Sequence, residues 1–296
     1  MNWDDLRIFL AVARTQNMAA AAARLAIDAT TVGRRVRRLE ADLDVTLFEA
    51  GPRGQALTEG GRRLLDYAEA AEHAAAQAKS DVAGERGLLA GTVRVSIAEG
   101  LGTWLVARHL REFHVSNPMI RVDLVATNGF LNPSKREADL AIMLARPAKG
   151  PLLARKLTDY RLKLYASREY AREHGLPSSS RDLAAHTLIG YIPDFIYAEE
   201  LRYLDEIADG LEPTLSSSSI NVQYGLLRSS AGVGVLPCFI GDQDPTLLRV
   251  LDTNVAITRS FWRVVHKDVA RLARVRAFTD WLDALVGSER KLLAGS

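Results

Sequence analysis

The stretch that decides the fold is Ile-Asp-Ala-Thr-Thr-Val-Gly-Arg-Arg-Val-Arg-Arg-Leu-Glu, residues 27–40. Asp28 is a favourable N-cap, because its carboxylate can accept hydrogen bonds from the free N–H groups of a first helical turn. Val32, Val36 and Leu39 recur at helical spacing and predict a narrow buried stripe. The opposite side of this helix carries Thr30, Arg34, Arg37 and Arg38, with Thr31 and Arg35 on its flanks.

A short helix with one apolar stripe and several arginines suits the groove of a polyanion such as DNA. The alternative is an ordinary solvated basic face, since charge runs are often plain surface. The residues that precede this helix favour the interpretation that it binds DNA. Residues 3–13 show the apolar spacing of an amphipathic helix, and residues 18–25 are nearly all alanine behind a possible N-cap, Asn17. Two helices, a tight turn and a third helix with arginines follow helix-turn-helix order.

A β-hairpin is predicted after this third helix. Residues 45–48 are expected to form a strand, residues 51–54 a turn, and residues 55–57 the returning strand. Arg53 would stand at the glycine-flanked tip, from which an arginine could reach a phosphate or the minor groove. The alternative for Arg53 is an ordinary solvent-exposed turn.

A long helix is predicted next, capped by Thr58 and running to about Gly84 or Gly87. It would span roughly 40 Å at ~1.5 Å per residue. Because a lone exposed helix of this length is rarely stable in water, we expect it to pair with its copy in a second subunit. Glycines 84, 87 and 91 then mark a linker.

Strands alternate with helices from Gly91 onward, which indicates an α/β sheet with right-handed crossovers. The predicted strands are 92–97, 120–125, 138–144, 152–157, 162–165, 187–191, 214–217, 233–236 and 261–266. The predicted helices are 104–113, 168–173, 199–208, 221–230 and 269–286.

Composition sets broad limits on the kind of protein. The chain has 296 residues, of which 48% are hydrophobic, which is ample for a core and for about two or three domains. Because the net charge is only +2, any basic surface that binds nucleic acid must be confined to one part of the chain. One cysteine, Cys238, excludes an internal disulfide framework. With no apolar run near the ~18 residues of a membrane span and no signal peptide at the N-terminus, we expect a cytoplasmic protein without a membrane partner.

Enzyme-like patterns in the sequence are poor matches. Gly100-Leu101-Gly102 follows a strand and imitates a dinucleotide-binding turn, with Asp123 about twenty residues later. However, Leu105 stands where close helix–strand packing needs a small residue. The six histidines lack metal-ligand spacing, and no Gly-x-Ser-x-Gly elbow is present. We therefore expect no catalytic activity, no metal and no cofactor.

Several motifs resemble those of the LysR-type transcriptional regulators. They include Ala-Ala-Ala-Arg-Leu at 21–25, Thr-Val-Gly-Arg-Arg-Val-Arg-Arg-Leu-Glu at 31–40, Leu-Phe-Glu at 47–49, Arg-Gly-Gln-Ala-Leu-Thr-Glu-Gly-Gly at 53–61 and Ala-Gly-Val-Gly-Val-Leu-Pro at 231–237. The likeness covers essentially the whole chain. The departures from the family pattern are Ala29 and Thr30 at the start of the arginine helix, then Gly33, Ala50 and Ser230.

The resemblance implies a winged helix-turn-helix domain at 1–58, a linker and dimerisation helix at 59–90, and an effector-binding domain at 91–296. The last would resemble periplasmic binding proteins, with lobe I at 91–160 and 267–296, lobe II at 161–266, and crossovers near 158–161 and 264–267. The implied function is a DNA-binding transcriptional regulator, a homodimer or homotetramer, that a small-molecule effector between the lobes controls. The alternative is a small-molecule-binding or enzymatic α/β protein whose N-terminal helices serve only assembly.

The resemblance also places site residues. Thr30, Thr31 and Arg34 would face bases of double-stranded DNA, and Arg53 would be the wing contact. Arg35, Arg37 and Arg38 would contact phosphates or other parts of the protein. The effector would meet loops at strand ends. There, free N–H groups at the helix starts near Thr103 and Ser219 would suit an anion, unless these side chains are simple caps. The predicted effector-binding residues are Gly100, Leu101, Thr103, Thr127, Asn128, Ser218, Ser219 and Asn221.

Overall fold

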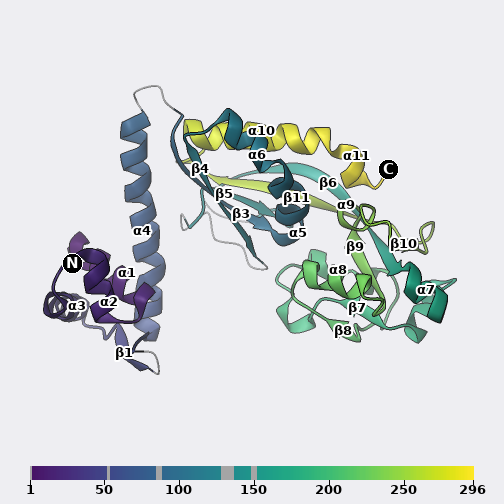
Figure 1. Ribbon diagram of the computed structural model, residues 1–296, viewed down its shortest axis with the longest axis horizontal. Coiled ribbons are helices and arrows are strands. Elements are labelled where there is room, and N and C mark those ends of the chain that lie inside the picture. Colours follow the sequence, from purple (N-terminus) through teal and green to yellow (C-terminus); the bar gives the residue numbers. More distant parts are fainter. Residues whose placement is uncertain (1, 52–53, 85–88, 128–136, 148–151) are drawn as a thin grey trace. The chain divides into compact units, whose positions relative to one another are not determined.

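The computed structural model describes residues 2–51, 54–84, 89–127, 137–147 and 152–296 (Figure 1). It contains two compact units, one formed mainly by residues 1–83 and the other mainly by residues 84–296. No helix in the described residues is both long enough and apolar enough to cross a membrane.

The N-terminal unit begins with three helices, α1 (Trp3–Thr15), α2 (Met18–Leu25) and α3 (Ala29–Leu43). Polar side chains cap the helices as predicted: Asn17 accepts from the N–H groups of Ala19 and Ala20, and Asp28 accepts from Thr30 N at 2.7 Å. The apolar stripe of α3 is buried against the first two helices, as expected from its spacing. The helix-turn-helix prediction is thus confirmed.

A two-stranded antiparallel hairpin follows, formed by β1 (Phe48–Gly51) and β2 (Gly54–Leu57), with Phe48 opposite Leu57. The predicted first strand at 45–48 is wrong, because β1 starts only at Phe48. The backbone of Leu47 has other partners: its N–H donates to the Glu40 carboxylate at 2.8 Å, and its carbonyl accepts from Thr58 N at 3.1 Å.

The long helix α4 (Glu59–Gly84) completes this unit. Thr58 caps it as predicted, since its Oγ1 accepts from Gly61 N at 3.0 Å. Arg14 of α1 joins the two helices through ion pairs to Glu72, at 2.7 Å, and Glu69, at 3.3 Å. The base of α4 is therefore fixed to the helix-turn-helix.

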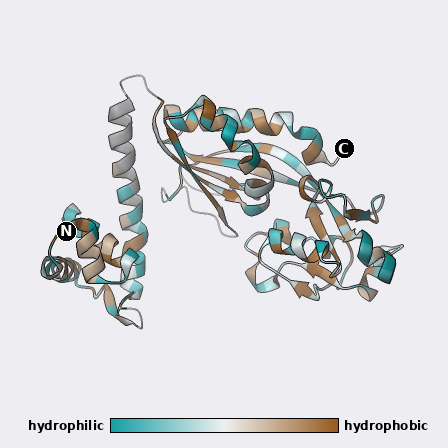
Figure 2. Ribbon diagram, viewed as in Figure 1, coloured by the Kyte–Doolittle hydropathy of each residue, from teal (hydrophilic) through white to brown (hydrophobic). Residues whose placement is uncertain are grey.

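The second unit is built on a nine-stranded sheet in the described residues, in the order β4-β3-β5-β11-β6-β9-β7-β8, with β10 also paired to β6. Apolar residues concentrate on its strands and on the covering helices (Figure 2). The strands are β3 (Gly91–Ala98), β4 (Ile120–Thr127), β5 (Leu140–Met143), β6 (Leu152–Ser167), β7 (Leu188–Gly190), β8 (Leu215–Ser216), β9 (Val233–Pro237), β10 (Leu247–Val250) and β11 (Ile257–His266).

Helices cover both ends of this sheet. Lobe I comprises β3, β4, β5 and the helices α5 (Glu99–Leu101), α6 (Ala107–Ser116) and α10 (Ala273–Ser288). In this lobe α6 packs on α10 through Phe113 and Phe278, with ring centroids 5.2 Å apart (Figure 1). Lobe II comprises β7, β8, β9 and their helices. The helices are α5 (Glu99–Leu101), continued by a π-helical turn (Gly102–Val106), α6 (Ala107–Ser116), α7 (Arg168–His174), α8 (Ile220–Arg228), α9 (Cys238–Gly241), α10 (Ala273–Ser288) and α11 (Arg290–Ala294).

The predicted helix at 199–208 is wrong. The chain forms two short 3-10 turns there, Glu199–Leu201 and Leu204–Glu206. Leu201, Tyr203 and Leu204 are all buried while Arg202 is exposed. One face of an α-helix cannot bury residues at this spacing, because positions i and i+2 point to opposite sides.

Two strands are shared by the lobes. The predicted strands 152–157 and 162–165 form one continuous strand, β6, which pairs with β11 in lobe I and with β9 in lobe II. The second crossover comes earlier than the predicted 264–267, because residues 262–265 of β11 already pair with β5 in lobe I. The change lies at a register shift between Phe261 and Trp262.

Candidate functional sites

The outward face of α3 carries the residues predicted to contact DNA. Arg34 and Arg37 are exposed, and neither forms an ion pair with any residue that the structure describes. Thr30 is also exposed, and its hydroxyl donates to Asp28 Oδ1 at 2.6 Å. Thr31 is half-buried at the edge of this face. Arg34 is therefore a cation that can turn toward a ligand outside the unit.

Arg35 and Arg38 are held by α1. Arg38 Nη2 donates to Asp5 Oδ2 at 2.6 Å, and Arg35 Nη1 lies 3.0 Å from Asp5 Oδ1 and 3.1 Å from Asp4 Oδ2. The Asp5 side chain is fully buried. Burial pushes the pKa of this carboxyl upward, but the hydrogen bonds from Arg38 and Arg35 outweigh it and leave the pKa below its ordinary value. The intramolecular role predicted for Arg35 and Arg38 is confirmed, and their contact with DNA stays a prediction.

Asp5 was not predicted from the sequence as part of this site. It lies one helical turn before Phe9, which is on the buried side of α1. A carboxylate at that spacing indicates a buried partner for the arginines of another helix.

The wing is attached to the turn between α1 and α2. Gln55 N donates to the carbonyl oxygen of Gln16 at 2.8 Å. Gly54 has a φ of +122°, and a Cβ at this position would collide with the same carbonyl oxygen. The predicted wing contact, Arg53, lies outside the described residues.

The effector residues predicted after β3 are not in a loop. Gly100 and Leu101 belong to α5, which begins directly after the strand, and both are buried. A Cβ on Gly100 would lie 3.3 Å from Ile240 Cδ1 and 3.4 Å from Ile220 Cγ2, so lobe II packs closely there. The loop expected at these two residues is therefore wrong.

The other predicted residues lie at several places. Thr103 is exposed in the π-helical turn, Thr127 is the last residue of β4 and pairs with Ala98, and Ser218 is half-buried just before α8. Asn128 lies outside the described residues. The structure brings Thr103, Ser219 and Asn221 together: Asn221 Nδ2 donates to Thr103 Oγ1 at 3.3 Å, and Trp104 Nε1 donates to Asn221 Oδ1 at 2.8 Å.

The prediction of free N–H groups at these helix starts is wrong. Glu99 of α5 reaches across to α8: Oε1 accepts from Ser219 Oγ at 2.9 Å and from Asn221 Nδ2 at 3.0 Å, and Oε2 accepts from Ile220 N at 3.1 Å. Val222 N donates to Ser219 Oγ at 3.2 Å. The N–H group of Thr103 lies inside a helix that already began at Glu99.

Beside Glu99 is a cavity of about 30 Å³ whose lining includes four tyrosines. Burial raises the pKa of Tyr160, Tyr191 and Tyr203, and raises that of Tyr197 to about 12 with help from the Glu99 charge. These hydroxyls therefore keep their protons at neutral pH. A neighbouring hollow of about 330 Å³ shares Tyr191 and Tyr203 with this cavity, so space for a ligand adjoins the contact between the lobes.

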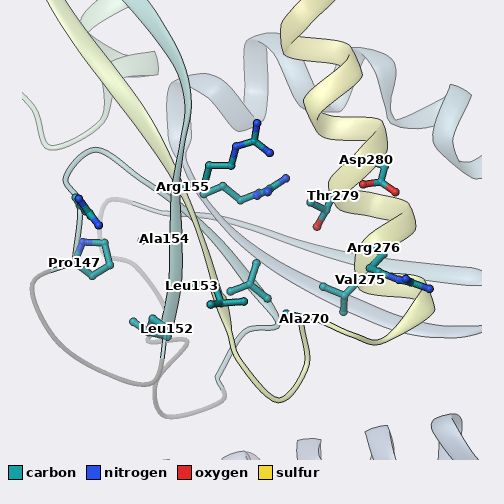
Figure 3. A pocket seen from close by; sticks show the side chains of 13 residues that line it. Pro147, Leu152, Leu153, Ala154, Arg155, Ala270, Val275, Arg276, Thr279 and Asp280 are labelled. Carbon is teal, nitrogen blue, oxygen red and sulfur yellow. The ribbon is translucent and has the colours of Figure 1, made fainter.

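A larger hollow, of about 700 Å³, lies in lobe I (Figure 3). It is lined by residues of β6 and β11 and by α10, and no site was predicted there. In Figure 3, Arg155 extends from its strand toward the side of α10 that carries Thr279 and Asp280. Three further arginines also line it: Arg146, Arg263 and Arg276.

A winged helix-turn-helix with an exposed arginine on its third helix, in one chain with a two-lobed α/β domain, defines a ligand-responsive DNA-binding regulator. The chain belongs to the LysR family of bacterial transcriptional regulators. Residues 3–62 match the family model for the bacterial regulatory helix-turn-helix protein, lysR family, and residues 86–286 match that for the LysR substrate binding domain. It is accordingly a transcription regulator and not an enzyme.

Relatives agree over nearly the whole length. The transcriptional regulator CrgA of Neisseria meningitidis is 29% identical over 292 residues, covering 97% of this chain and 98% of CrgA. The Mau operon transcriptional activator of Paracoccus denitrificans is 26% identical, covering 95% of each chain. The solved structure of CrgA superposes with a TM-score of 0.61 over 97% of this chain and 99% of CrgA. CbnR complexed with its target DNA gives 0.68 at 22% identity, covering 96% of this chain and all of CbnR.

Proposed function

We propose that this regulator reads its operator through the first half of α3, with Thr30, Thr31 and Arg34 toward the bases and Arg53 of the wing toward the DNA backbone. The observation that carries the proposal is the division among the arginines. Arg35 and Arg38 are held by Asp5, whereas Arg34 is exposed and forms no ion pair with a described residue. CbnR, which shares the fold, has been solved bound to its target DNA.

We propose that the working form is a homodimer paired through α4, with a homotetramer formed by two such dimers, in the cytoplasm. Support comes from the 26-residue length of α4 and from Tyr67, which is 73% exposed on it. A second copy of the helix would bury this ring. Two copies of α3 would then enter successive major grooves, about one helical turn apart.

The effector is proposed to be a small molecule that enters between the lobes, next to the tyrosine-lined cavity. The expectation of an anion at Ser219 loses its basis, because the Glu99 carboxylate already accepts the hydrogen bonds there. An assembly role alone for the N-terminal helices, together with an enzymatic α/β domain, is excluded by the family membership.

Replacing Arg34 with alanine should weaken binding to the operator by about tenfold, since one good base contact provides roughly 1–3 kcal/mol. Binding to unrelated DNA should change little. Gel shifts with the DNA upstream of the chain's own gene would measure both.

Arg53→Ala should instead lower the slope of affinity against salt by about one. Arg172→Ala, a change to an exposed arginine of lobe II, is the control. Unchanged operator binding in both Arg34→Ala and Arg53→Ala would refute this interface.

A further inference from the structure

We propose that Glu99 is a built-in carboxylate ligand: it fills the position between the lobes where an acidic effector would bind, and so selects against anions at that site. The inference rests on the proposed effector site between the lobes. It names anions as the class of ligand that this site excludes. Its ligand would instead be neutral or cationic, able to donate a hydrogen bond to a carboxylate.

The geometry around Glu99 is that of a bound carboxylate. Three donors converge on its two oxygens, namely Ser219 Oγ, Ile220 N and Asn221 Nδ2, at 2.9–3.1 Å. Two of them lie in the first turn of α8, a nine-residue helix, where the helix dipole also favours negative charge. Charge-assisted hydrogen bonds of this kind are about twice as strong as neutral ones.

This carboxylate joins the two lobes. Glu99 directly follows β3 in lobe I, whereas its three partners belong to lobe II. Because it is part of the chain, it acts at a high effective concentration that a free carboxylate cannot match. The adjoining cavity, of about 30 Å³, has room for about one water molecule, and Glu99 is the one charged side chain among the described residues that line it. An incoming anion would therefore meet a like charge and donors already in use.

The test is rescue of a vacated site by free acetate. Glu99→Ala keeps the Cβ and removes the part of the side chain that acetate resembles. We expect the alanine variant to have a lower melting temperature than wild type, and acetate to raise it in a saturable manner. Acetamide, and sodium chloride at the same ionic strength, should give no such increase. The wild type and Glu112→Ala, which loses an exposed carboxylate of α6, should not respond to acetate.

Glu99→Gln serves as a second variant if the alanine chain does not fold. It preserves volume but turns an NH₂ group toward existing donors, so we expect a lower melting temperature and no response to acetate. Three results would overturn the proposal. In the first, acetate raises the melting temperatures of wild type and Glu99→Ala equally, and in the second it raises that of Glu99→Ala no more than acetamide does. The third result is a melting temperature of Glu99→Gln equal to that of wild type. Gel shifts on the same samples distinguish a failure of this inference from a failure of the proposed DNA-binding function. If the variants bind DNA normally but acetate does not rescue Glu99→Ala, only the inference about Glu99 is refuted.

A separate observation points to a second ligand site, and we infer that the 700 Å³ hollow of lobe I binds an organic dianion. Arg155 of β6 and Arg263 of β11 stand directly opposite each other in the sheet, and both line the hollow. Like charges at such positions destabilise a sheet. An anion bound between them would offset that cost, and the volume lies in the range of small-molecule pockets.

The charges around this hollow leave guanidinium groups available. Arg263 Nη1 donates a hydrogen bond to Asp283 Oδ2 at 2.6 Å. Arg155 and Arg276, in contrast, form no ion pair with described residues. Among the described residues that line the hollow, Asp280 is the one acidic residue, and leucine, valine and alanine side chains supply an apolar wall. An aromatic dicarboxylate matches this combination of charge and apolar surface.

Phthalate is a suitable probe, with its uncharged dimethyl ester as the control ligand. We expect saturable phthalate binding by calorimetry with a Kd of about 1 mM or tighter, no binding of the ester, and at least about tenfold weaker binding in Arg155→Gln and Arg276→Gln. Arg172→Gln should bind like wild type. No saturable binding, or equal binding by Arg155→Gln, would refute the site. Because no residue of α3 or the Glu99 contact is altered, this result is independent of both earlier proposals.

Discussion

Gly54→Ala should release the wing and lower the free energy of unfolding of the N-terminal unit by about 3 kcal/mol. The backbone there has a φ of +122°, which costs an L-residue about 1–2 kcal/mol. The added methyl group would also collide with the carbonyl oxygen of Gln16, and such overpacking costs about 1–3 kcal/mol. The obstacle is backbone, which cannot rotate away as a side chain can. Separation of the strand from Gln16 would break the Gln55–Gln16 hydrogen bond.

Hydrogen exchange by mass spectrometry on the full chain would measure this change locally. Protection should fall in β1 and β2 and in the turn between α1 and α2. Gly287→Ala is the matched control, because a Cβ there meets no atom within 4 Å and the residue lies in α10. The control should keep or increase stability, by up to about 1 kcal/mol. Unaltered protection of the wing in Gly54→Ala would show that its attachment to Gln16 is unimportant.

Asp5→Ala should destabilise the same unit by about 2 kcal/mol at neutral pH. The change removes a fully buried carboxylate from two guanidinium groups. Loss of one partner of a buried ion pair typically costs about 3–5 kcal/mol, but the Arg38 and Arg35 side chains are 49% and 27% exposed and can regain water. Asp4→Ala is the control. Its carboxylate is 44% exposed, so we expect an effect below about 1 kcal/mol.

Acid should reduce the difference between wild type and Asp5→Ala. The folded-state pKa of Asp5 lies below its unfolded value, so its contribution is fully present above the unfolded pKa of about 3.9. It is lost as the pH falls through the lower, folded pKa. Urea unfolding of both chains at pH 7 and near pH 2 would check this. A difference that does not shrink at all between pH 7 and pH 2 would mean that the side chain acts through packing and not through charge.

The local features of the chain were predictable because neighbouring residues determine them. Asp28 caps α3, Thr58 caps α4, and the spacing of Val32, Val36 and Leu39 placed one face of α3 in the core. Each depends on residues within one or two helical turns. The alternation of strands and helices likewise indicated the α/β domain, although not its continuous strand β6.

The electrostatic pairings were not predictable from one sequence, because their partners are distant along the chain. Asp5 meets Arg38 across 33 positions, and Glu99 meets Ser219 across 120. Only the fold brings these groups within hydrogen-bond distance. From the sequence alone, all the arginines of α3 could therefore be assigned to DNA, and the N–H groups at the start of α8 could be assigned to a ligand. The structure shows instead that Asp5 binds two of these arginines and that Glu99 accepts from an N–H group at the start of α8.

The path of the chain through lobe I has a consequence for synthesis. Arg274, at the start of α10, donates through Nε to the carbonyl oxygen of Thr92, 182 positions earlier, and Phe278 packs on Phe113. A ribosome at about 5–20 residues per second would thus release the complete helix-turn-helix many seconds before β11 and α10 can close lobe I. The nascent regulator can fold its DNA-binding domain while its effector-binding domain is still incomplete. The synthesis of β11 and α10 is then the step that allows a newly made copy to complete the effector-binding domain.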